Sequence, residues 1–337
     1  MTFKAYKLYS FIIISFVFLS SCEKDKQINA NAYCASCEPC AKIPPSISPI
    51  PRQTKGTTFQ RLAPCFNPLN GNEIIYLTQD SLFYNSLAKY NLVTKKETVI
   101  LRGQRIVGQP KWGKNGWIVF AGLNLQIYKV KDNGDSLTQL TSVYSNTYPE
   151  WYGTDKIFFS VTSGSDKIAG NKIIGFDGTR LDSIQATVMN TVITYNSIND
   201  LMELVGLGGG VSDIVFMNLK SKQLNYLVKD TSNIIHYTTG VTWHPNNNDI
   251  YYSTTVVGEN NSGLVGICRL NKDSKENVLI KNACNSRSYS LLSISPDGKK
   301  IIAERQDYQL MPDNNLLKKS DICIMDIDGR NEEKVFK

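Results

Sequence analysis

One stretch near the C-terminal end of the chain constrains the fold more than any other. Residues 289–305 read YSLLSISPDGKKIIAER, in which two apolar or β-branched runs flank a Pro-Asp-Gly turn. Pro296 fixes φ for the turn and Gly298 accepts the positive φ that follows. The stretch is therefore predicted to form a β-hairpin.

Five weaker copies of this hairpin precede it, beginning at Ala63, Gly108, Thr147, Val192 and Gly240. Each copy carries a bulky apolar residue just before the turn, here called the anchor. The anchors are Phe66, Trp112, Trp151, Tyr195, Trp243 and Ile294. Successive anchors lie 39 to 51 residues apart, which is the spacing of blades in a β-propeller.

Two further strands follow each hairpin in the same order. The third strands begin near Leu87, Leu125, Asn171, Ser212, Val265 and Ser320, and the fourth near Lys96, Leu137, Thr179, Gln223, Glu276 and Glu332. Repetition at this period predicts an all-β fold, a β-propeller of six blades with four antiparallel strands each, over residues 61–337. The first blade would meet the last by packing alone, or residues 56–60 would add a strand to the last blade.

The repeated motifs resemble the TolB-type propeller repeat. The similarity is carried by SPDGKKIIAE with DICIMDIDG in the last repeat, and by QIYKVKDNG with the TQLT that ends at Thr141 in the second. It covers residues 61–337 and implies the same propeller fold. TolB proteins carry an N-terminal α/β domain that contacts their partners, whereas only a short segment precedes Arg61 here. The resemblance is thus to the propeller without that domain.

The N-terminal residues have the pattern of an export signal. Lys4 and Lys7 precede an apolar run over residues 11–19, which is shorter than the roughly 20 residues needed to span a bilayer. A cleaved signal peptide over residues 1–21 is therefore predicted, the alternative being an uncleaved anchor. Leu-Ser-Ser-Cys resembles the lipobox of bacterial lipoproteins, which implies that Cys22 is lipidated. No Asp follows Cys22, so the resemblance favours the outer membrane, facing the periplasm or the cell surface.

Residues 22–60 form a Pro-rich linker in this interpretation, and they contain a cluster of cysteines at Cys34, Cys37 and Cys40. This spacing allows metal or iron–sulfur ligation. Because an exported chain meets an oxidising compartment, disulfides or unpaired thiols are the interpretation we favour. With Cys22 lipidated, the other seven of the eight cysteines are an odd number, so one thiol would stay free or pair between chains.

The number and distribution of charged residues indicate which class of partner to expect. The formal net charge is +7, and removing Lys4 and Lys7 with the signal leaves +5, a modest excess that suits an anionic surface. No Lys/Arg cluster is interleaved with aromatic residues, so nucleic acid is not expected as a partner.

The Trp anchors and Trp117 are expected to pack between blades rather than to stack on a ligand.

Little in the sequence points to catalysis. The two histidines, His236 between blades and His244 in a turn, are too few for the His-rich metal site of propeller enzymes. No Gly-x-Ser-x-Gly motif indicates an accompanying hydrolase. The acidic residues Asp297, Asp326 and Asp328 belong to turns. No catalytic residue, metal or cofactor is therefore predicted.

Two functions remain. The first is a lipid-anchored, non-enzymatic propeller of the cell envelope that binds another envelope protein across a face or the channel. The alternative is a glycan- or small-ligand-binding propeller, or a degenerate propeller enzyme, that holds its ligand with channel aromatics and Asp or Asn. Loops over residues 256–263 and 306–319 are candidates for a partner surface, while the glycine run from Gly206 to Gly210 is read as a hairpin.

Overall fold

The computed structural model describes residues 60–80, 85–161, 170–184, 192–196, 201–208, 211–219, 221, 223–228, 235–257, 266–283, 287–310 and 316–336. The predicted signal peptide, Cys22, the linker up to residue 59 and the cluster of Cys34, Cys37 and Cys40 lie outside these ranges. No helix within the described residues is long and apolar enough to cross a membrane.

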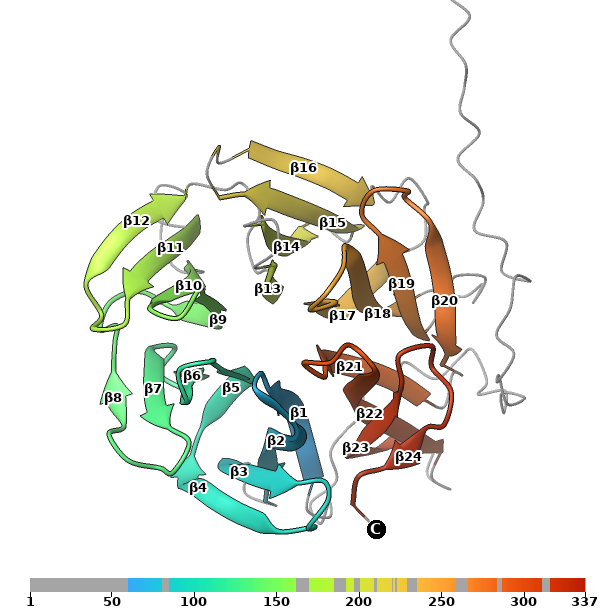
Figure 1. The fold of residues 1–337 in the computed structure, drawn as a ribbon, viewed down its shortest axis with the longest axis horizontal. Helices are drawn as coiled ribbons and strands as arrows, with labels where there is room; N and C mark the ends of the chain where they lie inside the picture. Colours follow the sequence, from blue (N-terminus) through green and yellow to red (C-terminus); the bar gives the residue numbers. More distant parts are fainter. Residues whose placement is uncertain are drawn as a thin grey trace, which may run out of the picture.

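The described residues form a ring of β-sheets around a central axis (Figure 1). There are six sheets, each has four strands, and the strands of each sheet are hydrogen-bonded in sequence order. All pairings within the sheets are antiparallel. The predicted propeller of six four-stranded blades is confirmed.

The strand bounds follow the repeat along the chain. The first blade consists of β1 (Gln60–Asn67), β2 (Asn70–Gln79), β3 (Asn85–Asn91) and β4 (Glu97–Gln104), and the second of β5 (Ile106–Trp112), β6 (Trp117–Gly122), β7 (Ile127–Lys131) and β8 (Thr138–Gln139). The third blade consists of β9 (Asn146–Tyr152), β10 (Lys156–Val161), β11 (Gly170–Gly175) and β12 (Arg180–Ile184), and the fourth of β13 (Val192–Asn196), β14 (Leu201–Gly208), β15 (Val211–Asn218) and β16 (Gln223–Val228). The fifth blade consists of β17 (Ile235–Trp243), β18 (Asp249–Val257), β19 (Gly266–Asn271) and β20 (Asn277–Asn282), and the sixth of β21 (Arg287–Ile294), β22 (Lys300–Leu310), β23 (Leu316–Asp326) and β24 (Glu333–Lys334).

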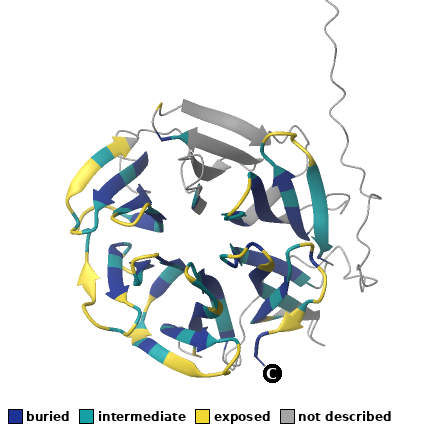
Figure 2. Cartoon of the chain, in the orientation of Figure 1, coloured by how far each residue is buried: buried dark blue, intermediate teal, exposed yellow. Residues whose placement is uncertain are grey.

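The core lies between neighbouring blades. Strand β6 reads WIVFAG because both of its faces are covered: Ile118 and Phe120 pack toward the first blade, whereas Val119 and Ala121 pack toward the third. In the coloured blades of Figure 2, the inner and middle strands are mostly buried, the outer strands β4, β8, β12 and β24 are largely exposed, and β20 is intermediate. Burial on both faces explains the near-continuous apolar runs of the second strands.

The Trp anchors are buried in these layers. Trp112, Trp151 and Trp243 retain only 5%, 6% and 5% of their surface. The indole N–H of Trp151 donates to the carbonyl of Lys111 in the preceding blade at 3.1 Å. Trp117 is partly buried and packs edge-on against Phe176. The expectation that these rings pack between blades is confirmed.

Within the part of the chain that the structure describes, the first and last blades meet by packing and share no strand. One apolar cluster joins Phe66, Ile74, Tyr76, Ala88 and Tyr90 of the first blade to Ile302, Ile322, Val335 and Phe336 of the last. Its polar counterpart is the buried Glu304, which accepts hydrogen bonds from the Ala63 amide at 3.2 Å and from the Gln306 amide group at 2.6 Å. We call this interface the seam.

Two expectations about loops and connections are wrong, and the alternative of an added strand over residues 56–60 can be followed only at its last residue. Gln60 pairs with Gln79 of the first blade, whereas residues 56–59 lie outside the described ranges. Residues 306–310 and 316–319 are not a loop, because β22 and β23 continue pairing from Gln306↔Ser320 to Leu310↔Leu316. His236 lies within β17 opposite Val256, rather than in a connection. In the last two cases the strands extend beyond the residues that the repeat pattern covers.

The glycine run forms the expected hairpin. Strand β14 ends at Gly208, which pairs with Val211 at the start of β15. The loop predicted over residues 256–263 lies outside the described residues except for the end of β18 at Val257.

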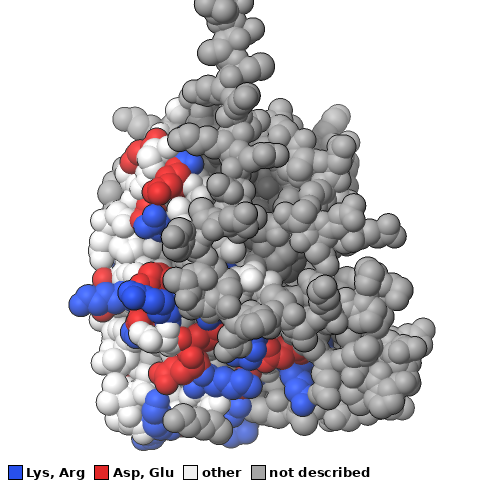
Figure 3. Space-filling view, turned by 90° about the vertical axis from the view of Figure 1, so that its right-hand side faces the viewer, with Lys and Arg blue, Asp and Glu red and all other residues white. Residues whose placement is uncertain are grey.

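An ion network lies between the fifth and sixth blades. Glu332 is its centre: the Lys281 ammonium group lies 2.8 Å from Oε2 and the Arg305 guanidinium 2.9 Å from Oε1, and the Tyr289 hydroxyl donates to Oε2 at 2.8 Å. Arg305 also pairs with Asp307 at 3.0 Å. The Glu332 side chain is only 8% exposed. On the surface of this side of the molecule, basic and acidic groups are interspersed (Figure 3).

Candidate functional site

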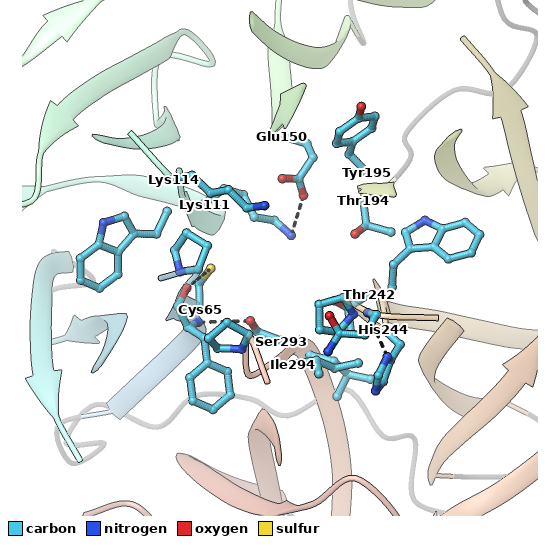
Figure 4. A pocket seen from close by; sticks show the side chains of 18 residues that line it. Cys65, Lys111, Lys114, Glu150, Thr194, Tyr195, Thr242, His244, Ser293 and Ile294 are labelled. Carbon is cyan, nitrogen blue, oxygen red and sulfur yellow. Dashed lines mark hydrogen bonds and ion pairs between the residues drawn. The ribbon is translucent and has the colours of Figure 1, made fainter. Parts of the chain in front are cut away.

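The candidate site is a cavity at one mouth of the central channel. It has a volume of about 280 Å³, and residues from all six blades line it. Each inner strand contributes the residue that directly precedes its anchor. These six side chains, here called the channel ring, are Cys65, Lys111, Glu150, Thr194, Thr242 and Ser293 (Figure 4).

The alternation of side chains along a strand explains why these residues face the channel. Successive residues of a strand point to opposite sides, so an anchor that packs between blades turns the residue before it toward the cavity. Lys111 precedes the buried Trp112, and Thr242 precedes the buried Trp243. The apolar repeat thereby determines the position of the polar channel ring.

Bulges in the inner strands lie just before the channel ring. Five of the six inner strands have a register shift there, and β13 pairs regularly. The backbone adopts positive φ at Ala63 (54°), Tyr148 (51°) and Leu291 (50°). Such conformations cost about 1–3 kcal/mol each in non-Gly residues, so the surrounding packing must hold them.

The bulges also bring backbone carbonyls close to the axis. The side-chain amide of Gln109 in the second blade donates to the carbonyl of Pro64 in the first blade, and to those of Leu291 at 3.1 Å and Leu292 at 3.4 Å in the last. Gln109 is buried. A single side chain therefore ties three blades together near the axis.

The charged members of the channel ring form one ion pair. The Lys111 ammonium group lies 3.1 Å from Oε2 of Glu150, and both side chains are 13% exposed. The Trp151 amide donates to Oε1 of the same carboxylate at 2.9 Å. Lys111 and Lys114 extend from the second blade toward Glu150 (Figure 4). Both oxygens of Glu150 are therefore engaged.

A thiol, an imidazole and a carboxylate line the same cavity, but their contacts do not assemble a nucleophilic centre. His244 uses both ring nitrogens, because Nδ1 accepts from the Asn246 amide at 3.2 Å and Nε2 lies 3.1 Å from the Gly298 carbonyl. The first contact assigns the proton to Nε2. Burial raises the pKa of the Cys65 thiol despite the nearby Lys111, which disfavours the thiolate that a nucleophile needs.

The three cysteines of the described residues are unpaired and buried: Cys65, Cys268 and Cys323. Burial raises the pKa of Cys268 to about 12 and also raises the pKa of Cys323. We expect iodoacetamide at pH 8 to alkylate these thiols more than about tenfold more slowly in the folded protein than in guanidinium, since only the exposed thiolate reacts. Peptide-resolved mass spectrometry measures this, and equal rates would contradict it.

The other predicted site residues can be placed only in part. Asp297 and Asp328 lie in turns as expected: Asp297 accepts from the Lys299 amide and Asp328 from the Arg330 amide, both at 3.1 Å. Asp326 was also expected in a turn, but it is the last residue of β23, where it pairs with Lys300. The described residues contain no group of three or more His, Cys, Asp or Glu side chains arranged to hold a metal. Metal binding by Cys34, Cys37 and Cys40 stays an untested prediction.

The channel ring was not predicted from the sequence. Only the anchors were singled out, although the six repeats align the position before each anchor as well. Of those six residues, three carry a hydroxyl, one a thiol and two opposite charges. A hydroxyl, thiol or charged residue directly before the anchor in every repeat is the signal that would have revealed it.

Comparison with solved structures places this architecture among known propellers. A protein of Agrobacterium tumefaciens assigned as TolB is similar with a TM-score of 0.58 and 16% identity, covering 75% of this chain and 88% of that one. TolB of Acinetobacter baumannii has a TM-score of 0.56 and 13% identity over 81% of this chain, which spans 62% of that one. An oligogalacturonate lyase of Vibrio parahaemolyticus has a TM-score of 0.53 and 12% identity, covering 87% and 79%.

No family model and no curated protein sequence matches the chain. By its fold, the molecule is an all-β propeller with a polar ring at one mouth of its channel. Its propeller fold is similar to that of the TolB structures. The resemblance that the repeat motifs indicated is confirmed at the level of the fold.

Proposed function

We propose that this protein is a non-enzymatic interaction module of the bacterial envelope. Its propeller binds a segment of another envelope protein at the channel mouth, while lipidated Cys22 anchors it to the outer membrane. The observation that supports this best is the channel ring, in which six inner strands present hydrogen-bonding side chains around one open cavity. Pre-formed concave sites with a few convergent polar groups are typical binding sites.

The absence of catalysis is part of the proposal. The residues of the cavity that could react are engaged elsewhere: His244 holds a neighbouring turn, Glu150 holds Lys111, and the Cys65 thiol has a raised pKa. Enzymes occur among propellers of similar fold, including the oligogalacturonate lyase. Fold similarity alone does not decide between binding and catalysis.

The test is site-specific photocrosslinking in cells. A photoreactive amino acid replaces Asn246, which is exposed at the cavity, and in a control it replaces Leu181, which is 52% exposed on an outer strand. We expect one envelope protein to crosslink at position 246 and not at position 181, and Cys22→Ala to abolish this crosslink. Equal crosslinking at both positions, or none at 246 in a folded and abundant protein, would contradict the proposal.

A glycan is the second candidate, because the hydroxyl groups of Thr194, Thr242 and Ser293 occupy one side of the channel ring. Hydroxyl and amide groups suit saccharide recognition as well as peptide backbone. The buried Trp anchors leave little ring surface for stacking on a sugar. Binding on a glycan array that is lost in Thr242→Val would favour this candidate.

A further inference from the structure

The side chains at the channel mouth carry more N–H donors than the acidic acceptors there can satisfy. Among the described residues that line the cavity, Glu150 is the one acidic residue, and both of its oxygens already accept a bond. Lys111 offers three N–H groups and directs one of them to Glu150. The cavity therefore retains donor capacity that no acidic group of its lining satisfies.

Lys114 adds to this surplus. It lines the cavity and is exposed, and no acidic group of the described residues lies within ion-pair distance of it. Lys111 and Lys114 extend in the same direction, so their charges act on the same part of the opening (Figure 4). Among the described lining residues, two ammonium groups and one carboxylate give the mouth a net positive charge.

Partial burial of the lysine and glutamate side chains strengthens the attraction of the channel mouth for an anion. The Lys111–Glu150 pair is 13% exposed on both sides, so water screens it less than it would on the open surface. A ligand carboxylate could take the remaining N–H groups of Lys111 without displacing Glu150, and such charge-assisted hydrogen bonds are about twice as strong as neutral ones. Glu150 then acts as a positioning residue that holds the Lys111 side chain.

We propose that the channel mouth recognises a carboxylate on an acidic side chain of the partner polypeptide, and that Lys111 and Lys114 bind this carboxylate. The hydroxyl groups of Thr194 and Thr242 face the lysines across the channel and bind neighbouring peptide groups. This inference rests on the proposed function and specifies the chemistry of the partner. It predicts an Asp or Glu in the bound segment.

The test uses the intrinsic fluorescence of Trp112 and Trp243, which line the cavity. The probe is the blocked decapeptide acetyl-(Gly-Glu)5-amide, titrated at low salt against its glutamine counterpart acetyl-(Gly-Gln)5-amide. We expect the acidic probe to bind at least about tenfold more tightly than the glutamine probe. We also expect added salt to weaken its binding, because screening acts on the charges.

Variants locate the interaction. Lys111→Met and Lys114→Met should each weaken binding of the acidic probe by about tenfold, whereas Lys96→Met, at an exposed turn of the first blade, should leave it unchanged. Circular dichroism and thermal unfolding verify that each variant is folded. Equal affinity for the two probes, or no loss in the Lys111→Met and Lys114→Met variants, would overturn the inference.

Two outcomes separate this inference from the proposed function. A partner that crosslinks at position 246 with unchanged yield after its acidic residues are replaced by amides would overturn the inference and leave the interaction module standing. Lysine-dependent binding of the acidic probe without any crosslinked protein would support the inference and contradict the proposed function. Lysine-dependent binding of tetragalacturonic acid, with no binding of the acidic peptide, would overturn the assignment to a polypeptide.

Discussion

Replacing Phe336 by Ala is expected to destabilise the propeller by about 3–5 kcal/mol, the usual loss for a buried Phe. Its ring retains 9% of its surface and packs against Tyr76 and Tyr90, with centroid separations of 5.0 and 4.6 Å. The guanidinium group of Arg61, which belongs to the first blade like Tyr76 and Tyr90, lies 4.0 Å from the centroid of the Phe336 ring. Truncation would therefore remove contacts that join the last blade to the first.

Urea unfolding measures this loss, and Leu69→Ala is the matched control. Leu69 belongs to the first blade but is 69% exposed, so its truncation should change stability by less than about 0.5 kcal/mol. Hydrogen exchange gives a second readout: amides of β1 and β22 should lose protection before those of β6. Uniform loss of protection, or an unchanged free energy of unfolding, would mean that this cluster does not close the ring.

Replacing Glu332 by Gln is expected to cost about 3–5 kcal/mol at pH 7, because it leaves buried cations without their carboxylate. Lys281 loses its partner at 2.8 Å and Arg305 loses one of two carboxylates. Glu276→Gln is the control, since Glu276 is 61% exposed and pairs with Arg269 at 3.4 Å. This control should change the free energy of unfolding little.

The same variant carries a pH signature. Burial alone would raise the pKa of Glu332, but hydrogen bonds and charge from Lys281, Tyr289 and Arg305 outweigh burial and lower it. A depressed folded-state pKa stabilises the protein above the unfolded pKa of about 4.3, and this contribution is lost as pH falls through the folded value. The difference between wild type and Glu332→Gln should therefore shrink from pH 7 toward pH 3. A difference that stays constant over this range would contradict the role of ionised Glu332.

The features of the fold that recur in every repeat are the ones that could be predicted from the sequence. Anchors such as Trp151 and turns such as the one at Gly298 recur at blade spacing, so the number of blades and their four strands could be read from residues alone. The long β22–β23 hairpin could not, because residues 306–310 and 316–319 have no counterpart in the repeat. Backbone pairing between the two strands continues through both of these ranges.

The site could be predicted less well, for a physical reason. The bulges at Ala63 and Leu291 need positive φ, which neither residue favours, so nothing local in the sequence indicates them. Their conformation depends on contacts between blades, such as the bond from the Ala63 amide to Glu304. Gln109 likewise acquires its role only once the first, second and last blades meet. Tertiary packing thus sets the details of the channel that the repeat leaves open.

The channel ring separates recognition from folding. Each of its six residues comes from a different blade and precedes an anchor that carries the packing. A substitution at Thr194 or Thr242 would alter the chemistry of the opening without touching the buried layers beside it. The propeller is thus a scaffold on which the ligand selectivity of the channel mouth can change through one blade at a time, while the packing between blades stays the same.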